Sequence, residues 1–221
     1  MANYAVDQKL LQDYLPNKTE FDLWNGTCYV SLVGFMFLNT AIKGIKIPFH
    51  TNFEEVNLRF YVRYNDRGEW KRGVVFIKEI VPKPALTFVA NTVYNENYET
   101  LPMAHSWEPK DDALNVEYRW KKKKWNSFKV ITSPESSLIE SGSEEEFITE
   151  HYWGYTKIND KTSEYGVEHP KWKVYKMKDY SIDVDFADVY GPQFEFLKAE
   201  KPLSVFLAEG SEIKVMSGRS I

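Results

Sequence analysis

The sequence predicts a mainly β fold of the α+β class, an antiparallel β-barrel with two or three short helices. Many short segments alternate apolar and polar residues between turns, whereas the few helical patterns stand alone. The sequence shows neither a repeated strand–helix–strand pattern nor a glycine-rich phosphate loop, which disfavours a doubly wound parallel fold. The chain of 221 residues has the length of one barrel domain, so we expect residues 1–221 to form a single domain.

The composition predicts a well-filled core and argues against several partners. Hydrophobic residues make up 43% of the chain and aromatic residues 16%, enough to bury a core without disulfides or structural metals. The net charge of −4 gives no general attraction to nucleic acid or to anionic membranes. Cys28 is the single cysteine, and no apolar run has the length of a signal peptide or a membrane span. We therefore expect a cytoplasmic protein with no nucleic-acid partner, no membrane partner and no cofactor.

The first two elements are a helical pattern and a strand pattern. Residues 4–15 place apolar side chains at helical spacing ahead of Pro16, which predicts a short helix. Residues 27–40 are apolar at both parities, as in a strand covered on both faces. Gly34 inside that strand indicates a bend or a close approach of the backbone to another element.

The clearest strand pattern runs from 53 to 64. Its even-numbered residues from Val56 to Tyr64 are apolar or aromatic, and polar residues alternate with them. We call four of the alternating residues the polar row: Glu55, Asn57, Arg59 and Tyr61. A turn at 65–68 and the apolar segment 73–81 predict that this strand belongs to a β-hairpin.

Two further helices are predicted from their start signals. Pro84 opens a helical stripe over 84–94. Ser143 with Glu146 three residues later forms a capping box, which predicts a helix near 144–152.

The remaining segments are predicted as strands and loops. Residues 114–131 read as a second hairpin, and 133–142 read as a polar loop. Strand-like segments follow at 153–158, 163–168, 171–178, 202–207 and 211–216.

Six blocks spread along the chain carry a family resemblance. They are YVSLVGFMF at 29–37, FEEVNLRFYVR at 53–63, RGVVFIKEI at 72–80, FITEHYWGY at 147–155, EHPKWKVY at 168–175 and PLSVFLAEGSEIKV at 202–215. The chain resembles the YqjF-like family of uncharacterised bacterial proteins, and the block at 53–63 is the most specific. The resemblance implies a fold similar to acetoacetate decarboxylase, a β-barrel around an internal cavity, in a family with no established activity.

The sequence departs from the decarboxylases at one position that matters for their chemistry. In those enzymes, a lysine after the helix that follows the hairpin forms a Schiff base with the keto acid. Here no lysine occurs from Ala85 to Pro109, and residues 94–98 read YNENY. Neither tyrosine nor asparagine carries a primary amine, so decarboxylation through an imine is not expected.

The polar row has two interpretations, and the sequence leaves both open. In the first, the row faces water and the apolar face fills the barrel, as in half-solvated sheets. In the second, the row lines the cavity that the resemblance implies, and the apolar face packs under a helix. Arg59 would then hold a carboxylate or another oxyanion, and Glu55 would neutralise Arg59 before a ligand binds. Tyr98 would also contact the ligand, as would His105, which lies where the segment resembles the family's ligand-proximal loop.

Other polar residues support weaker hypotheses. Lys78 and Glu79 are adjacent on a strand, so only one can face the interior, as a relocated amine or as a general base. An outward glutamate is the more common condition. The four histidines, among them His50, are too far apart in sequence to predict a metal site. Residues 121–124 are four lysines between two tryptophans, which suits single-stranded nucleic acid but also a solvated hairpin tip.

These patterns together favour a small-molecule-binding barrel for an organic acid or keto compound, with an anionic ligand at Arg59. The alternative is a non-catalytic protein with a barrel filled by aromatic side chains, which acts through protein–protein contacts. The sequence does not distinguish an enzyme from a binding protein, and it does not give the ligand or the oligomeric state.

Overall fold

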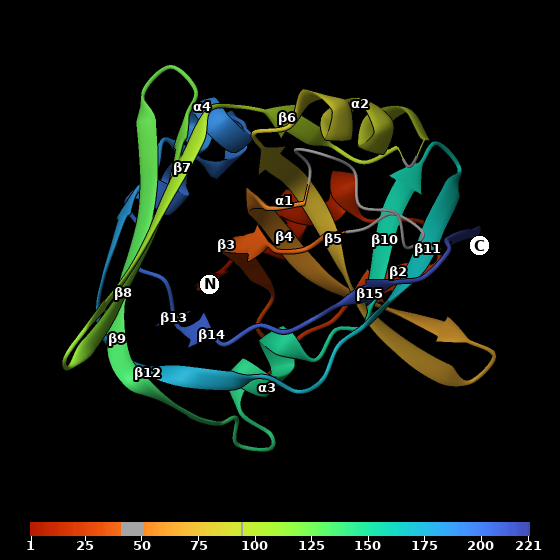
Figure 1. Cartoon of the computed structure of the whole chain (residues 1–221). Coiled ribbons are helices and arrows are strands. Elements are labelled where there is room, and N and C mark those ends of the chain that lie inside the picture. Colours follow the sequence, from red (N-terminus) through yellow and green to blue (C-terminus); the bar gives the residue numbers. More distant parts are fainter. Residues whose placement is uncertain (41–50, 94) are drawn as a thin grey trace.

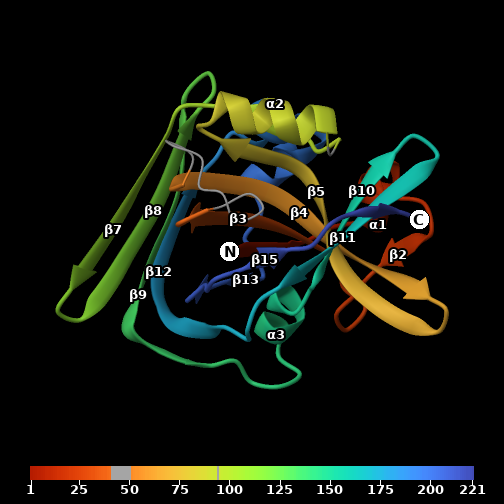
Figure 2. The same ribbon diagram turned by 45° about the vertical axis from the view of Figure 1, so that its right-hand side comes forward.

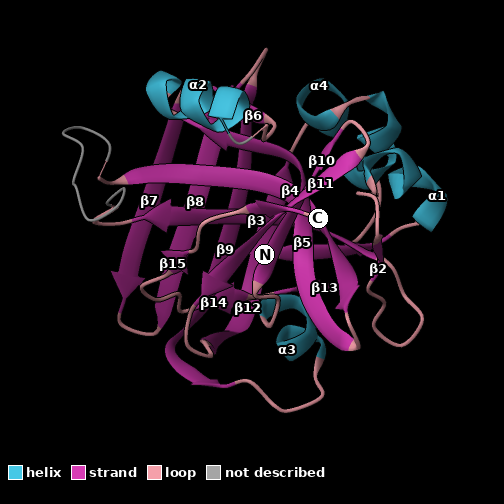
Figure 3. Cartoon of the chain, turned by 90° about the vertical axis from the view of Figure 1, so that its right-hand side faces the viewer, coloured by secondary structure: helices cyan, strands magenta, loops and turns pink. Residues whose placement is uncertain are grey.

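Two β-sheets make up most of the computed structural model, which describes residues 1–40, 51–93 and 95–221 (Figures 1 and 3). The larger sheet contains β1 (Ala2–Ala5), β2 (Thr19–Phe21), β3 (Tyr29–Phe37), β4 (Phe53–Asp66), β5 (Glu69–Val81), β6 (Tyr98–Thr100), β10 (Trp153–Ile158), β11 (Lys161–Glu168), β13 (Ser204–Val205), β15 (Lys214–Val215) and β16 (Arg219–Ser220). The smaller sheet contains β7 (Met103–Lys110), β8 (Ala113–Lys121), β9 (Trp125–Leu138), β12 (Lys173–Asp183) and β14 (Leu207–Ala208). The mainly β prediction is confirmed.

The helices are short and lie around the sheets. They are α1 (Gln8–Leu11), α2 (Pro84–Val93), α3 (Glu144–Thr149), α4 (Phe186–Tyr190) and the 3-10 segments η1 (Gln12–Tyr14) and η2 (Pro192–Lys198). In Figure 2, α2 and α3 lie at opposite ends of the molecule. None of the helices in the described ranges has the length and apolar character needed to cross a membrane.

Local signals located the starts of α2 and α3 correctly, and α3 ends at Thr149, before the predicted end at residue 152. Helix α2 begins at Pro84, as predicted, and position 94 of the predicted helix lies outside the described residues. The Ser143 hydroxyl accepts a hydrogen bond from the backbone N–H of Glu146 at 3.2 Å, which caps α3. The side chain of Glu146 in turn accepts from the backbone N–H of Gly142 at 2.7 Å.

Strands β4 and β5 form the predicted hairpin. Arg67 and Gly68 connect them with φ values of 59° and 99°. A two-residue hairpin turn needs this left-handed backbone, because it matches the twist of the flanking strands. The hairpin lies at the centre of the larger sheet, between β3 and β10.

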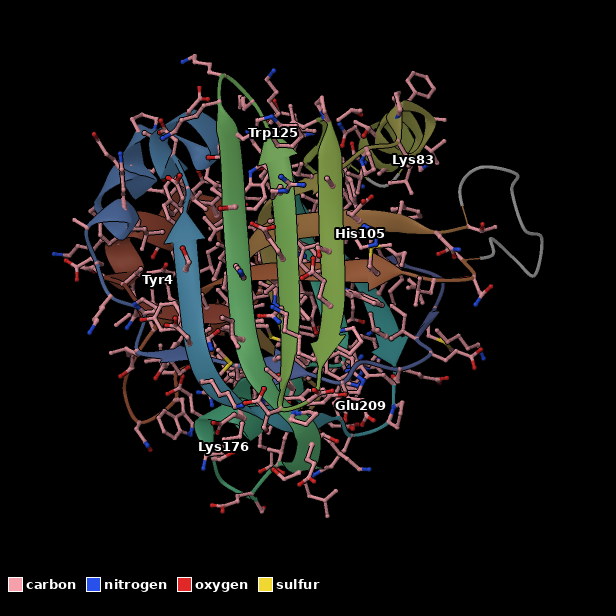
Figure 4. The ribbon with its side chains drawn as sticks, turned by 60° about the vertical axis from the view of Figure 1, so that its left-hand side comes forward. Tyr4, Lys83, His105, Trp125, Lys176 and Glu209 are labelled. Carbon is pink, nitrogen blue, oxygen red and sulfur yellow. The ribbon has the colours of Figure 1, made fainter. Side chains whose placement is uncertain are left out.

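The apolar face of β4 lies in a core shared with the smaller sheet and with α4, whose Phe186, Val189 and Tyr190 belong to the same cluster. A single apolar cluster contains Val56, Leu58, Phe60 and Val62 of β4 and Val116, Trp120, Phe128 and Val130 of β8 and β9. Figure 4 shows the strands of the smaller sheet crossing those of the larger sheet behind them. Gly34 of β3 faces the same space, where an added Cβ would lie 2.9 Å from the Tyr118 ring. The predicted close approach at this glycine is confirmed.

A closed barrel is not confirmed. Neighbouring strands of the larger sheet follow the order β13-β1-β3-β4-β5-β10-β11-β15, and those of the smaller sheet follow β14-β12-β9-β8-β7. In the described part of the chain, neither order returns to its first strand. The strand pairs are antiparallel except for β5 with β10 and β5 with β6.

Three local predictions are wrong in part. The predicted helix at 4–15 begins at residue 8, because residues 2–5 pair with β3 and β13. The predicted loop at 133–142 starts as a continuation of β9, which pairs with β12 as far as Leu138. The predicted loop around His105 is strand β7, paired along its length with β8. In each case a pairing between distant segments overrode the local pattern.

Candidate functional site

The polar row faces the protein interior. The exposed fraction is 2% for Glu55, 1% for Asn57 and 1% for Tyr61, and Arg59 is partly buried. The other face of β4 is buried against the smaller sheet, so this strand is covered on both faces. The interpretation in which the row faces water is therefore wrong.

Glu55 is held by two hydrogen bonds from its neighbours. Asn57 Nδ2 donates to Oε1 at 3.0 Å, and the Tyr98 hydroxyl donates to Oε2 at 3.2 Å. Burial raises the pKa of Glu55 to about 7, although both hydrogen bonds lower it. Among the groups that shift the pKa of Glu55, Arg59 has the smallest effect. The carboxyl is held by these two hydrogen bonds and not by an ion pair with Arg59. At neutral pH the carboxyl of Glu55 can therefore either hold or release a proton.

A β-bulge places Glu79 beside the polar row. Arg59 pairs with Phe76, but the register shifts by one residue beyond it, so that Asn57 pairs with Glu79. Glu79 is 3% exposed. Burial, followed by the charges of neighbouring carboxyls, raises the pKa of Glu79 well above its usual value, although the adjacent Tyr98 hydroxyl lowers it. Its Oε2 has no hydrogen-bond partner among the described residues.

Lys78 lies on the opposite face of the same strand. Its Nζ donates to Glu99 Oε2 at 3.0 Å and to the backbone oxygen of Val189 at 2.6 Å. An amine held in this way is turned away from the polar row. The hypothesis that Lys78 replaces the Schiff-base lysine at this site is wrong.

Glu96 supplies a third carboxyl, and we call Glu55, Glu79 and Glu96 the carboxyl cluster. Burial raises the pKa of Glu96, although its hydrogen bond from Thr156, at 2.7 Å, lowers it. The charge of Glu96 in turn helps to raise the pKa of both other members of the cluster. Glu96 also lines a pocket of about 350 Å³ with Phe76 and Thr156.

Two tyrosines complete the polar surroundings of the carboxyl cluster. Burial and the nearby carboxyls raise the pKa of Tyr98 and of Tyr165 well above the usual value. Both hydroxyls therefore stay protonated at neutral pH, and Tyr98 already donates its hydrogen to Glu55.

Arg59, two residues beyond Asn57 on β4, is the cationic residue of the row. Its Nη2 lies 3.9 Å from the sulfur of Met1, and its guanidinium lies 5.6 Å from the centre of the Tyr61 ring. Its Nε is buried and has no hydrogen-bond partner in the described part of the chain. Tyr61 is fixed by its hydroxyl, which donates to Ser31 Oγ at 2.7 Å. The guanidinium is thus positioned with hydrogen-bonding capacity left for an acceptor.

His151 belongs to a second polar group, next to Tyr61. Its Nε2 lies 3.1 Å from Asp22 Oδ2, which also accepts from Arg72 Nε at 2.6 Å. The His151 ring lies 4.7 Å from the Tyr61 ring. Burial lowers the pKa of His151 to about 4, although Asp22 raises it, so the imidazole is neutral at pH 7.

The structure does not bring His105 to the polar row. His105 lies on β7, where its Nδ1 lies 2.7 Å from Glu54 Oε1 (Figure 4). Glu54 and Glu55 are adjacent on β4 and point to opposite faces. His105 therefore lies on the side of the smaller sheet, at the edge of the apolar core.

The lysine run lies at a hairpin tip, and the described histidines belong to no metal-binding group. Lys122, Lys123 and Lys124 are paired with Glu99, Asp188 and Asp183 at the tip of the β8–β9 hairpin. These ion pairs favour the solvated hairpin tip over a nucleic-acid surface. In the described ranges, no group of three or more His, Cys, Asp or Glu side chains is arranged to hold a metal ion, and His50 lies outside them.

Sequence reasoning predicted part of this site and missed the rest. The structure brings together Tyr98 and the polar row, all of which were predicted. The sequence favours an outward Glu79, and it gives no signal for Glu96 or Tyr165. Glu96 lies in a short connection after α2, where no periodic pattern indicates which side chains turn inward.

Comparison with known sequences identifies a family. The model of the DUF2071 family, described as an uncharacterized conserved protein, matches residues 1–212. The uncharacterized protein YqjF of Bacillus subtilis (strain 168) is 28% identical over 174 residues, which are 77% of this chain and 69% of that protein. The resemblance to the YqjF-like family is confirmed.

Comparison with solved structures confirms the decarboxylase-like fold. Acetoacetate decarboxylase from Legionella pneumophila matches with a TM-score of 0.61 at 10% identity, over 100% of this chain and 82% of that one. The enduracididine biosynthesis enzyme MppR complexed with pyruvate matches with a TM-score of 0.63 at 12% identity, over 99% and 86%. MppR with bound HEPES buffer gives a TM-score of 0.66 at 11% identity, over 100% and 84%. At these identities the likeness shows the fold and not the chemistry.

Proposed function

We propose that this chain, which belongs to the DUF2071 family of uncharacterized conserved proteins, binds a small organic acid or keto compound at the polar row. The observation that carries the proposal is a buried strand face that keeps unused hydrogen-bonding atoms. Arg59 Nε, Asn57 Oδ1 and Glu79 Oε2 are buried without a partner among the described residues. Buried polar atoms are rarely left unpaired in a folded protein, because each costs about 1–3 kcal/mol, so these atoms favour a ligand-binding surface.

Arg59 is the residue that we assign to the acid group of the ligand. A guanidinium can form two parallel hydrogen bonds to a carboxylate, which fixes both the charge and the orientation of the bound acid. Arg59 has a free Nε, whereas the neighbouring Arg63 is already paired with Glu20 at 2.6 Å. Tyr61 and Tyr98 would then border the ligand from two sides.

Proton transfer is the chemistry that the site would support. A buried carboxyl with a pKa near neutrality is suited to general acid–base catalysis, and the pKa of Glu55 is raised to about 7. Because Lys78 is paired on the other face, an imine route has no amine at this position. We propose that any reaction here proceeds through proton exchange between the carboxyl cluster and a carbonyl compound.

We further propose how the ligand is enclosed and where the protein acts. The two sheets, together with α2 and α3, would form the walls that a barrel provides, without joining into one closed sheet. Residues 1–221 would act as one domain. Cys28 is a buried free thiol in the described chain, which is compatible with the reducing cytoplasm.

The test is the affinity of the full chain for pyruvate and acetoacetate, measured by isothermal titration calorimetry. Arg59→Ala should weaken binding by at least about tenfold, because a charge-assisted pair is lost. Arg63→Ala is the matched control, since Arg63 lies on the same strand with its side chain 42% exposed. Circular dichroism would verify that both variants fold.

Unchanged affinity in Arg59→Ala would overturn the assignment of the acid group. If the wild-type protein binds neither acid, and native mass spectrometry of freshly purified protein finds no co-purifying metabolite, the proposal of a ligand-binding interior fails. The alternative, a protein that acts through its surface, would then be favoured.

A further inference from the structure

The buried atoms without a hydrogen-bond partner at the polar row include a donor at one position and acceptors at another. At Arg59 the unpaired atom is a donor, Nε. Two residues away, the unpaired atoms are acceptors, Asn57 Oδ1 and Glu79 Oε2. Asn57 and Glu79 are register partners on β4 and β5, so their side chains leave the same face of the sheet side by side.

The two acceptors cannot satisfy each other when Glu79 is ionised. An amide oxygen and a carboxylate oxygen both accept hydrogen bonds and both carry negative partial charge. Asn57 already donates one hydrogen of its amide nitrogen to Glu55. In the ionised state of Glu79, a group that satisfies both oxygens must therefore bring hydrogens with it.

The local charge decides between a neutral and a cationic donor. Glu55 and Glu96 add two further carboxyls to the surroundings of Glu79, and Arg59 acts on Glu55 more weakly than any other neighbour that shifts its pKa. A cation among buried carboxyls is stabilised by their charge, whereas a neutral hydroxyl gains only its hydrogen bonds.

We infer that the ligand of the polar row is zwitterionic: a protonated amine binds between Asn57 and Glu79, and an acid group of the same molecule binds at Arg59. This inference rests on the proposed function, because it assumes an acid at Arg59, and it adds the chemical class of the ligand. Residues two apart on a strand are separated by about 7 Å, so the amine and the acid are separated by a few carbon atoms. A short ω-amino acid has this form.

Binding of such a ligand should release protons. Burial and mutual repulsion raise the pKa values of Glu55 and Glu79, so these carboxyls hold protons near neutral pH. An ammonium group favours their ionised form and drives the protons into solution. A carboxylic acid without an amine would bind at Arg59 but would not drive protons from Glu55 and Glu79.

The experiment uses three probes that differ in one group: butyrate, 4-hydroxybutyrate and 4-aminobutyrate. Their affinities for the full chain are measured by calorimetry near pH 7 in two buffers of different ionisation enthalpy, which reports protons released. We expect 4-aminobutyrate to bind at least about tenfold more tightly than butyrate, with proton release, and 4-hydroxybutyrate to resemble butyrate. Glu79→Gln should abolish the preference for the amine, whereas Glu209→Gln, on an exposed turn, should leave the preference intact.

The outcomes separate this inference from the proposed function. Equal affinity for butyrate and 4-aminobutyrate, with binding that depends on Arg59, would overturn the inference and leave the proposed function standing. Equal affinity for the hydroxy and amino compounds would also overturn it, because a neutral donor would suffice. If none of the three binds, the inference is overturned, and the proposed function is decided by its own titrations with pyruvate and acetoacetate. A preference for the amine that survives Glu79→Gln would show that the amine binds elsewhere.

Discussion

Replacing Glu55 with Gln should make the protein more stable at alkaline pH than the wild type. Gln keeps an oxygen for the amide of Asn57 and presents a polar group to the Tyr98 hydroxyl, but it cannot ionise. The pKa of Glu55 is raised from 4.5 to about 7 in the folded protein. Its stabilising contribution is therefore fully present below pH 4.5 and is lost as the pH rises through about 7.

The size of the effect follows from that difference in pKa. Each unit corresponds to about 1.4 kcal/mol, so a rise from 4.5 to about 7 corresponds to about 3 kcal/mol between acidic and alkaline pH. Removing Glu55 also relieves the repulsion that raises the pKa of Glu79, which acts in the same direction. The advantage of Glu55→Gln should thus grow steadily with pH.

Urea unfolding of both proteins at several pH values between about 5 and 8 would measure this difference, because titrations elsewhere in the chain cancel between them. The control is Glu209→Gln, which removes a carboxyl from an exposed turn. A difference between wild type and Glu55→Gln that stays constant within about 0.5 kcal/mol over this range would refute the reasoning, since it would mean that Glu55 is not driven towards its neutral form by burial.

Two further substitutions test the packing around the site by thermal or urea unfolding. Gly154→Ala should lower the free energy of unfolding by more than about 2 kcal/mol, because the added Cβ would overlap the Tyr165 ring. The control Gly166→Ala should lower it by less than about 1 kcal/mol, because the nearest neighbour of its Cβ is a flexible methionine at 3.4 Å. Similar losses in the two variants would contradict the close approach at Gly154. Asp22→Ala should lower the free energy of unfolding by about 2–3 kcal/mol, because His151 and Arg72 would lose the buried carboxylate that they share. A loss below about 0.5 kcal/mol would show that these contacts of Asp22 do not stabilise the fold.

The candidate site was predictable to the extent that it lies on one strand. Alternation along β4 grouped the polar row on one face, and this grouping needs only the two-residue repeat of a strand. The same alternation could not show that the row is buried, because a polar face normally turns to water. Its burial follows from the packing of both faces of β4 in the folded chain.

Residues from other segments were less predictable. Tyr98 reaches Glu55 because β6 pairs in parallel with β5. Glu96 acts on both other carboxyls from a connection whose path depends on the packing of α2. His105 was placed at the site by analogy with a loop, but pairing of β7 with β8 carries it to the other sheet.

By itself, the sequence determined what short-range physics controls: the capped start of α3, the proline start of α2, the β4–β5 turn and the alternation of β4. The tertiary structure alone decided which carboxyls converge. Counting from the turn without a bulge would pair Asn57 with Lys78, whereas the observed register pairs it with Glu79. A shift of one residue reverses the face of every following side chain, and the packing of the whole sheet selects it. Because of this one bulge, the carboxyl of Glu79 lies beside the polar row, and the amine of Lys78 lies on the opposite face of β5.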